Sequence, residues 1–378
     1  MNEHSLFENF QQSPLLNSLA DRIAMSQHHS KPLQIFLQNT QGASIVFILQ
    51  SIFSHPATQH LNHLVVLNDA EEAAYFFNSI ESMTDAMDLF YFPSSYKMPH
   101  HFGSLNSSHI MLRTEALTKI SMGGNKKIVV TYAEALFEKV ILPSTLKQNI
   151  IQIKTNDTLD VYGLVQQLVD YGFERTDFVY EPGQFALRGG IFDIYSFGNE
   201  KPYRIELFGE EVDSIRIFDP ATQLSERKLL QVNIIPNVTT QFDDTTKISL
   251  LNYLSKDCLI WLKDWNVTKQ KGMDQQEALW DFLALPSSLQ VNQENELQKK
   301  QIQKEDFETV EDTELQLSSK HIIEWGFQAN LANEKLVFNT QAQPSFNRQF
   351  QYLIENIQTY EKKGYHIFIF AEQAKQLE

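Results

Sequence analysis

The stretch from Gly172 to Arg216 constrains the fold of this chain more than any other part. It contains four short runs in which apolar and polar residues alternate, at Gln184–Leu187, Ile191–Tyr195, Tyr203–Phe208 and Val212–Ile217. Glycine-containing breaks separate the runs, and short breaks of this kind make consecutive strands pair as an antiparallel meander. Phe192 and Ile194 alternate with Asp193 and Tyr195, so we expect one apolar face and one polar face on this sheet.

The same stretch carries a specific series of residues. It reads Phe173-x-Arg175, Pro182-Gly183-x-Phe185-x-x-Arg188-Gly189-Gly190-Ile191-x-Asp193-Ile194, Pro202-x-Arg204-Ile205-Glu206-x-Phe208-Gly209-x-Glu211 and Ser214-Ile215-Arg216-x-Phe218-Asp219. This series resembles domain 2 of two kinds of bacterial repair protein, UvrB and the transcription-repair coupling factors. The flanking sequence resembles them more weakly, over nearly the whole chain.

Nearer the N-terminus, a buried-strand candidate that ends at Leu37 is followed by a polar loop and a helical run to Phe53. Strand, tight loop and helix are the setting of a nucleotide P-loop. A P-loop also needs an earlier glycine and a lysine before its Ser/Thr, and those places hold Leu37 and Ala43, with only Gly42 and Ser44 in pattern. Taken alone, the pattern favours an ordinary strand-to-helix turn. With the resemblance, it predicts a RecA-like fold that has lost its nucleotide site, so no cofactor is expected.

The order of elements predicts an α/β fold. Further strands are expected at 64–67 and 127–131, each followed by a helix, at 69–80 and 133–141, as in a parallel sheet. The resemblance implies a degenerate RecA-like (P-loop NTPase-like) parallel-sheet domain at 28–143 and an inserted α+β domain with the antiparallel meander at 144–231. A third, mixed α/β domain would combine 1–27 with 232–378. We expect the N-terminal helix at 15–23 to pack on that third domain.

Three further expectations concern the second half of the chain and the insert. A helix beginning near Asp157 is predicted to cover the apolar side of the meander. The charged composition of Asn292–Lys320 predicts a solvated face or a partly disordered insertion. A helix at Phe346–Lys362 and a strand at His366–Phe370 close the chain, and a buried strand with no helix after it predicts a fragment of a longer protein.

Charge and composition narrow the classes of function. The chain has 47 Asp and Glu against 31 Lys and Arg, a net charge of −16, which opposes tight binding of a phosphate backbone. Cys258 is the only cysteine, so an internal disulfide and a cysteine-based zinc site are excluded, as suits a reducing cytoplasm. No leader pattern and no apolar run of about 18 residues is found, so we expect a cytoplasmic protein without a membrane partner.

The segment between Leu89 and Met111 departs from UvrB. At the equivalent place UvrB carries a long aromatic hairpin that separates DNA strands, and here the segment is short, which favours the coupling factors. Its histidines, His100, His101 and His109, suggest a cluster of metal ligands as an alternative. Loop histidines without helical spacing or carboxylate partners mostly face solvent, so no metal site is predicted.

Carboxylates close in sequence also suggest catalysis as an alternative. They are Asp193, Glu206, Glu210, Glu211 and Asp213. A catalytic pair needs an enclosing cleft, whereas charges on strands and hairpin tips are usually solvated, so we predict no catalytic residues.

The resemblance implies a protein-interaction module. In the coupling factors such a module imitates UvrB and recruits UvrA, the damage-recognition ATPase, to a stalled RNA polymerase in transcription-coupled nucleotide excision repair. The resting protein covers this surface with its C-terminal regulatory domain. The ATP-driven DNA translocase and the contacts with RNA polymerase and DNA belong to domains outside these 378 residues, so this chain itself is not expected to be an enzyme. The alternative is a UvrB-like DNA-damage-binding component of the excision nuclease.

The resemblance also implies where UvrA binds. The UvrA-binding residues are expected at Arg175, Phe185, Arg188 and Tyr195, some of them on the polar side of the meander. UvrB often has a third arginine where this chain has Ala186. Arginine beside an exposed aromatic ring is typical of binding hot spots. The alternative for both arginines is an intramolecular pair with Glu174, Glu181 or Asp193.

Overall fold

The fold was analysed in a computed structural model of the whole chain. The structure describes residues 7, 10–27, 31–83, 88–98, 102, 105–124, 126–237, 247–255, 257–286, 302–347 and 349–368. Its larger sheet has seven strands, all parallel, in the order β17-β1-β16-β15-β2-β4-β3. Their bounds are β1 (Gln34–Gln38), β2 (Asn62–Leu67), β3 (Leu89–Phe92), β4 (Ile128–Tyr132), β15 (Cys258–Lys263), β16 (Ile322–Trp325) and β17 (Glu334–Val337). The predicted α/β class is confirmed.

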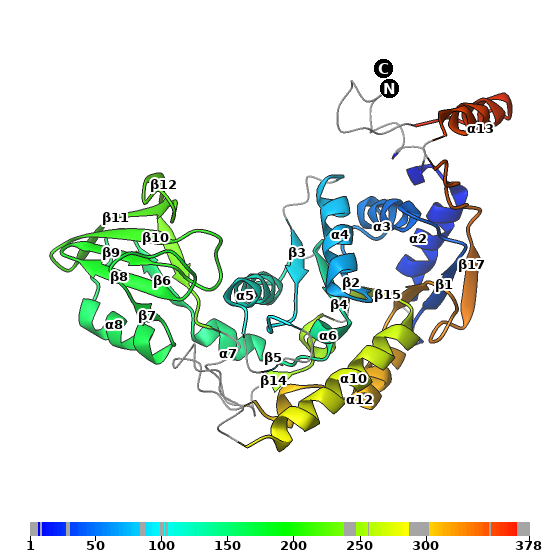
Figure 1. Cartoon of the computed structure of the whole chain (residues 1–378). Helices are drawn as coiled ribbons and strands as arrows, with labels where there is room; N and C mark the ends of the chain where they lie inside the picture. Colours follow the sequence, from blue (N-terminus) through cyan, green and yellow to red (C-terminus); the bar gives the residue numbers. More distant parts are fainter. Residues whose placement is uncertain are drawn as a thin grey trace.

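Helices cover both faces of this sheet (Figure 1). One face carries α2 (Pro14–Ser26), α3 (Ser44–Ser54) and α4 (Ala70–Glu81), and the other carries α6 (Ala133–Leu136), α10 (Trp265–Ala284) and α12 (Val310–Ser318). The helix α3 is buried nearly all round because its apolar residues face both the sheet and its neighbouring helices. The residue before α4, Asp69, caps the helix, since its carboxylate accepts a hydrogen bond from the Glu72 amide.

The larger sheet joins two stretches that were expected to form separate domains. The strands β16 and β15 lie between β1 and β2, so residues 258–325 complete the sheet that residues 34–67 begin. The helix α2 packs on α3 in the same core, and Arg22 forms an ion pair with Glu334. The arrangement differs from the expected third domain made of 1–27 and 232–378. The reason is that strands of a parallel sheet can pair with strands from distant parts of the chain, so β15 and β16 joined the first sheet.

The insert is built on a six-stranded sheet in the order β12-β11-β10-β9-β8-β7. Its strands are β7 (Glu174–Arg175), β8 (Gln184–Arg188), β9 (Ile191–Ile194), β10 (Tyr203–Phe208), β11 (Glu211–Phe218) and β12 (Ser225–Leu229), and all pairs except β7 with β8 are antiparallel. This confirms the predicted meander. The helix α8 (Val161–Asp170) buries Leu164 and Leu168 against Phe192 on one face, as expected. Two further strands, β6 (Ile151–Lys154) and β13 (Gln231–Ile234), pair where the chain enters and leaves the insert.

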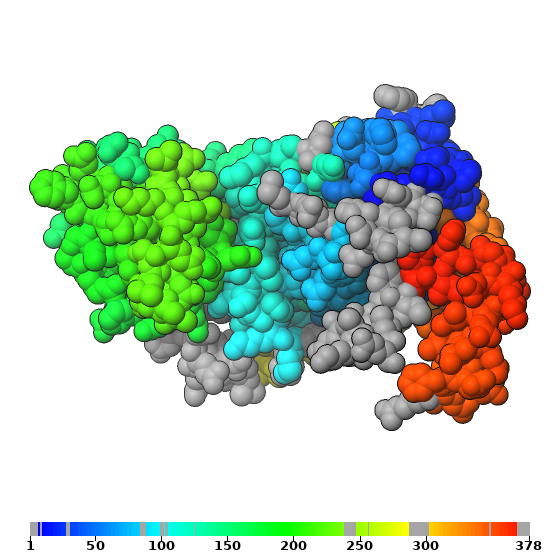
Figure 2. Space-filling view, turned by 90° about the horizontal axis from the view of Figure 1, so that it is seen from above, coloured from blue at the N-terminus to red at the C-terminus, as the bar shows by residue number. Residues whose placement is uncertain are grey.

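The helix α5 (Ser107–Ser121) connects the insert to the larger sheet (Figure 1). It packs along β3, yet Ile110 is fully buried in the core of the insert. The next residue, Met111, packs against a smaller apolar cluster on the other face of the insert's sheet. In the space-filling view the insert forms one end of the molecule and α13 (Phe350–Lys362) lies at the other (Figure 2).

Several local predictions need correction. The helix expected at 133–141 ends at Leu136, and Val140–Ile141 form β5, which pairs with β14 (Lys247–Ile248). The prediction of a solvated or partly disordered insertion at 292–320 is wrong from residue 302 onward. There the chain forms the 3-10 helix η2 (Lys304–Asp306) and α12, and Phe307 and Leu317 are buried in apolar clusters. Residues 292–301 lie outside the described part.

The end of the described chain differs from the prediction in part. The helix α13 forms as expected, but none of its residues is buried. Of the strand expected at 366–370, residues 366–368 form no strand and the last two lie outside the described residues. Among the helices that the structure describes, none is long and apolar enough to cross a membrane.

Candidate functional site

The loop after β1 was the first candidate, as a degenerate P-loop. Leu37 is fully buried inside β1, and Gly42 takes a positive φ of 54° in the turn. The Gln41 amide donates to the hydroxyl oxygens of Ser44 and Thr340, each at 3.0 Å. A phosphate needs backbone amides that point outward from such a loop. Here one of them is already bonded within the protein.

Two carboxylates lie at the carboxyl ends of neighbouring strands, where ligands of parallel sheets usually bind. Glu324 is fully buried, and both its oxygens accept hydrogen bonds from the amides of residues 330–332. Asp264 accepts the Phe327 amide at 2.7 Å. Both carboxylates therefore hold the loop after β16 in place, and their bonding is structural.

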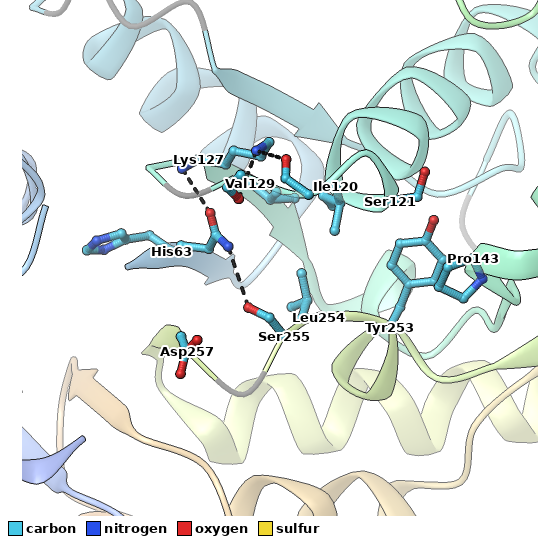
Figure 3. Close-up of a pocket in the computed structure, with 13 residues that line it drawn as sticks. His63, Ile120, Ser121, Lys127, Val129, Pro143, Tyr253, Leu254, Ser255 and Asp257 are labelled. Carbon is cyan, nitrogen blue, oxygen red and sulfur yellow. Dashed lines mark hydrogen bonds between the residues drawn. The ribbon is translucent and has the colours of Figure 1, made fainter. Parts of the chain in front are cut away.

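A pocket of about 280 Å³ opens at the opposite edge, where β2 and β4 begin (Figure 3). Lys127 lines it, but its ammonium donates to the carbonyl oxygens of Gly123 and Gly124 at the end of α5. The Asn62 side chain joins the Lys127 amide to Ser255. These polar groups bond to one another, which makes the pocket a weak candidate for a ligand site.

The short segment after β3 packs on the body of the protein. Tyr96 pairs with Leu105 as an isolated antiparallel bridge, and Tyr96 and Phe102 pack against Leu279 of α10 and against Phe307. His109 contacts the Ser94 carbonyl through Nδ1 at 2.7 Å. The other two histidines of the drawn cluster, His100 and His101, lie outside the described residues. Within the described ranges, no group of three or more His, Cys, Asp and Glu residues is placed to hold a metal ion.

The strongest candidate is the outer face of the six-stranded sheet, by which we mean the face opposite α8. At its centre Asp193 is fully buried and accepts three hydrogen bonds. One comes from Arg188 Nη2 at 2.5 Å, and two come from Arg204 Nε and Nη2 at 2.8 and 2.9 Å. Hydrogen bonds to Asp193 raise the pKa of Arg204, whose guanidinium also lies 4.4 Å from the centre of the Phe218 ring. Asp193 thus fixes two arginines on one face.

The remaining carboxylates of the suggested catalytic group begin with Glu206, which is bonded within the sheet. Glu206 accepts hydrogen bonds from Ser214 at 2.5 Å and from Arg216 at 3.2 Å. Asp193, bound to Arg188 and Arg204, and Glu206 are thus both paired, whereas Glu210, Glu211 and Asp213 are exposed. This arrangement fits an ordered surface.

The four expected contact residues do not share one environment. Arg175 is exposed and forms no ion pair with any residue that the structure describes. Arg188 pairs with Asp193, as the intramolecular alternative predicts, but 33% of its side chain stays exposed. Phe185 and Tyr195 are buried, so the expectation of exposed rings at these positions is wrong.

The burial of these two rings has a physical reason in each case. Phe185 points toward α8 and packs edge-on against Phe192, with ring centres 6.0 Å apart. Tyr195 does lie on the outer face, but Met111 of α5 packs on its apolar cluster, and its hydroxyl donates to the Glu200 carbonyl. Burial raises the pKa of Tyr195.

Two exposed rings that sequence reasoning missed lie in the loop that Arg188 contacts. Phe178 and Tyr180 belong to the loop between β7 and β8 and are 49% and 55% exposed. The Arg188 guanidinium lies 4.4 Å from the centre of the Phe178 ring. The sequence signal is an aromatic-aliphatic-aromatic triplet, Phe178-Val179-Tyr180. In the structure only its middle residue is buried. The Arg-plus-aromatic composition expected of a binding surface is therefore present, but with other rings.

Comparison with known proteins gives a family match for this part of the chain. Residues 151–239, which contain the whole six-stranded sheet, match the family model described as the UvrB interaction domain.

About half of the chain is similar to curated transcription-repair-coupling factors. That of Haemophilus influenzae is 28% identical over 191 residues, which are 50% of this chain and 17% of that protein. That of Borreliella burgdorferi is 27% identical over 213 residues, 56% of this chain and 18% of that protein. That of Bacillus subtilis is 34% identical over 162 residues, 42% and 14% respectively. The matched region thus spans less than a fifth of the length of these relatives.

Proposed function

We propose that a chain with a UvrB interaction domain and this similarity to transcription-repair-coupling factors is a UvrB-mimicking module that binds UvrA in transcription-coupled nucleotide excision repair. The observation that supports this most directly is the outer face of the insert. There Arg188 is fixed by Asp193, remains partly exposed and lies against an exposed aromatic ring. Such a combination is typical of the few residues that contribute most of the binding energy at an interface.

The proposal also covers the other partners that the family resemblance implies. We assign contacts with RNA polymerase and DNA, ATP-driven translocation, and the regulatory domain that covers the UvrA surface to segments outside this chain. The alternative, a UvrB-like component that grips damaged DNA, is disfavoured by the net charge of −16 and by the packing of Tyr96 and Phe102 onto the body.

The first test changes the two arginines. We expect Arg175→Ala and Arg188→Ala each to weaken UvrA binding by about 1–3 kcal/mol, or roughly tenfold in dissociation constant. Arg188 also pairs with Asp193, which is fully buried, but Asp193 keeps its two hydrogen bonds from Arg204 when Arg188 is removed, so the melting temperature should change little. Titration of labelled UvrA with each variant gives the affinity, and thermal unfolding gives the stability.

Arg227→Ala is the matched control for these changes. Arg227 is an exposed arginine of β12 that pairs with Ile217, on the face that α8 covers. It should bind UvrA like the unchanged chain. Arg175 pairs with Phe185, whose ring points toward α8, so Arg188 is the one of these two arginines that lies on the outer face. An unaltered affinity in the Arg188 variant would remove the outer face from the proposed function.

A second test concerns nucleotide. We propose that the chain neither binds ATP at micromolar concentration nor hydrolyses it, because the loop after β1 has Ala43 in the place of the phosphate-binding lysine and bonds the Gln41 amide internally. A labelled ATP analogue, titrated up to about 100 µM with UvrA as the positive control, should show no saturable signal. Saturation in that range would contradict this proposal.

A further inference from the structure

We propose that the loop of residues 176–181 is the aromatic anchor of the partner interface. In this arrangement Phe178 and Tyr180 enter an apolar depression of the partner, and Arg188 bonds a carboxylate at its edge. The inference rests on the proposed function, since it names the contact chemistry of the same face. The family resemblance pointed to Phe185 and Tyr195, which are buried, so the loop is assigned from its geometry alone.

Val179 fastens the loop to the sheet. It is fully buried on the outer face, in the cluster that also contains Ala186, Tyr195 and Phe218. Its two neighbours, Phe178 and Tyr180, are about half exposed. Burial of Val179 attaches the loop to the apolar cluster, so the fold does not require large apolar residues on either side of it.

Hydrogen bonds hold the backbone around the two rings. Arg188 Nη1 donates to the Asp177 carbonyl at 2.5 Å, and Thr176 Oγ1 donates to the Phe178 carbonyl at 2.9 Å. The Gln184 side chain accepts the amides of residues 180 and 181, and Gln223 Nε2 donates to the Val179 carbonyl at 3.0 Å. The rings are therefore presented from an ordered loop, and binding would lose little conformational entropy in fixing them.

The neighbouring groups indicate the chemistry of the partner. Arg188 gives one hydrogen bond to a carbonyl and one to Asp193, and its Nε donates to no residue in the described part of the chain, which leaves donors for a carboxylate. Leu224, which is 68% exposed, follows Gln223 in the chain, and Gln223 binds the loop. The partner that fits is a protein surface with an apolar depression and an acidic side chain.

Single-stranded nucleic acid would also stack on exposed rings. The loop, however, carries exposed carboxylates at Asp177 and Glu181, which would repel a phosphate backbone. These charges favour a protein partner, and binding of an oligonucleotide becomes an outcome of the experiment.

The test measures UvrA affinity of the whole chain with Phe178→Ala, Tyr180→Ala and their double variant. We expect each single change to raise the dissociation constant at least fivefold and the double change at least thirtyfold, with the melting temperature unchanged because both rings are half exposed. Tyr162→Ala is the matched control, since Tyr162 is 90% exposed on α8, on the opposite face of the sheet, and should bind as the unchanged chain does. Conservative Phe178→Tyr and Tyr180→Phe variants should bind within twofold of the unchanged chain.

The outcomes separate the two proposals. If Arg188→Ala weakens binding but neither ring variant does, the loop is not an anchor while the proposed function stands. If the unchanged chain does not bind UvrA at all, the proposed function fails and the anchor fails with it. Binding of a labelled single-stranded oligonucleotide that is lost in the double ring variant, with UvrA affinity intact, would also overturn the inference.

Discussion

Replacing Glu138 by alanine is expected to lower the free energy of unfolding by about 3–5 kcal/mol. Glu138 and Arg113 form an ion pair at 3.4 Å, and both side chains are almost completely buried. The carboxylate also accepts the Ser94 hydroxyl and the Ser95 amide, so its removal leaves a buried guanidinium and two donors without their partner. Equilibrium denaturation in urea, followed by circular dichroism, measures the difference.

A double variant separates the missing partner from the lost volume. Arg113→Met with Glu138→Leu replaces the buried pair by apolar side chains of similar size, and we expect it to unfold with a smaller loss than Glu138→Ala alone. Equal losses in both variants would mean that the ion pair itself stabilises the protein. A loss below about 1 kcal/mol for Glu138→Ala would contradict the burial of this pair.

The second large effect concerns acid. Burial lowers the pKa of His63 to about 3, and its Nδ1 accepts a hydrogen bond from Trp261 Nε1 at 2.9 Å, which requires the neutral ring. The unfolded chain takes up a proton near pH 6.5, whereas the folded chain does not until about pH 3. Stability is therefore lost as pH falls through this window, by about 2–3 kcal/mol at pH 4.5 from this residue. Denaturation curves between pH 7.5 and about 4.5 test it.

His63→Gln is the control for this pH dependence. Its side-chain oxygen keeps an acceptor for Trp261 but carries no group that titrates in this range. Burial also lowers the pKa of His109 and of His321, so both residues make the folded protein less stable as the pH falls. Both are present in the variant and in the unchanged chain. The variant should therefore lose less stability on acidification than the unchanged chain. Parallel curves for the two proteins would show that His63 does not cause the loss.

The local elements of this fold were predictable because their signals are local. Alternation of residues and glycine breaks identified the strands β8 to β11, and the strand, loop and helix at Gln34–Ser54 were expected within a residue or two. Partners across the sheet were not predictable. That β16 and β15 lie between β1 and β2 depends on pairing between residues as far apart as Cys258 and Asn62 or Ile322 and Gln34, which periodicity does not encode.

The sequence predicted the type of candidate site, an arginine beside aromatic rings, but not which aromatic residues are exposed there. Alternation placed Tyr195 on the outer face correctly, yet Met111, distant in sequence, covers the cluster in which it lies. Phe185 was expected as an exposed ring, although its register with Ile194 places it on the apolar face. Phe178 and Tyr180 lie between strands, where alternation carries less weight, and their exposure follows from the burial of Val179.

The position of α5 has a mechanical consequence. Because Ile110 lies in the core of the insert while the same helix packs along β3, the insert is attached by a shared helix in addition to its two connecting chains. A force that a bound partner exerts on the insert would pass along α5 into the larger sheet. The buried contact between Arg113 and Glu138 lies directly on that path, one helical turn from Ile110. A partner that pulls on the insert would thus load the larger sheet through α5.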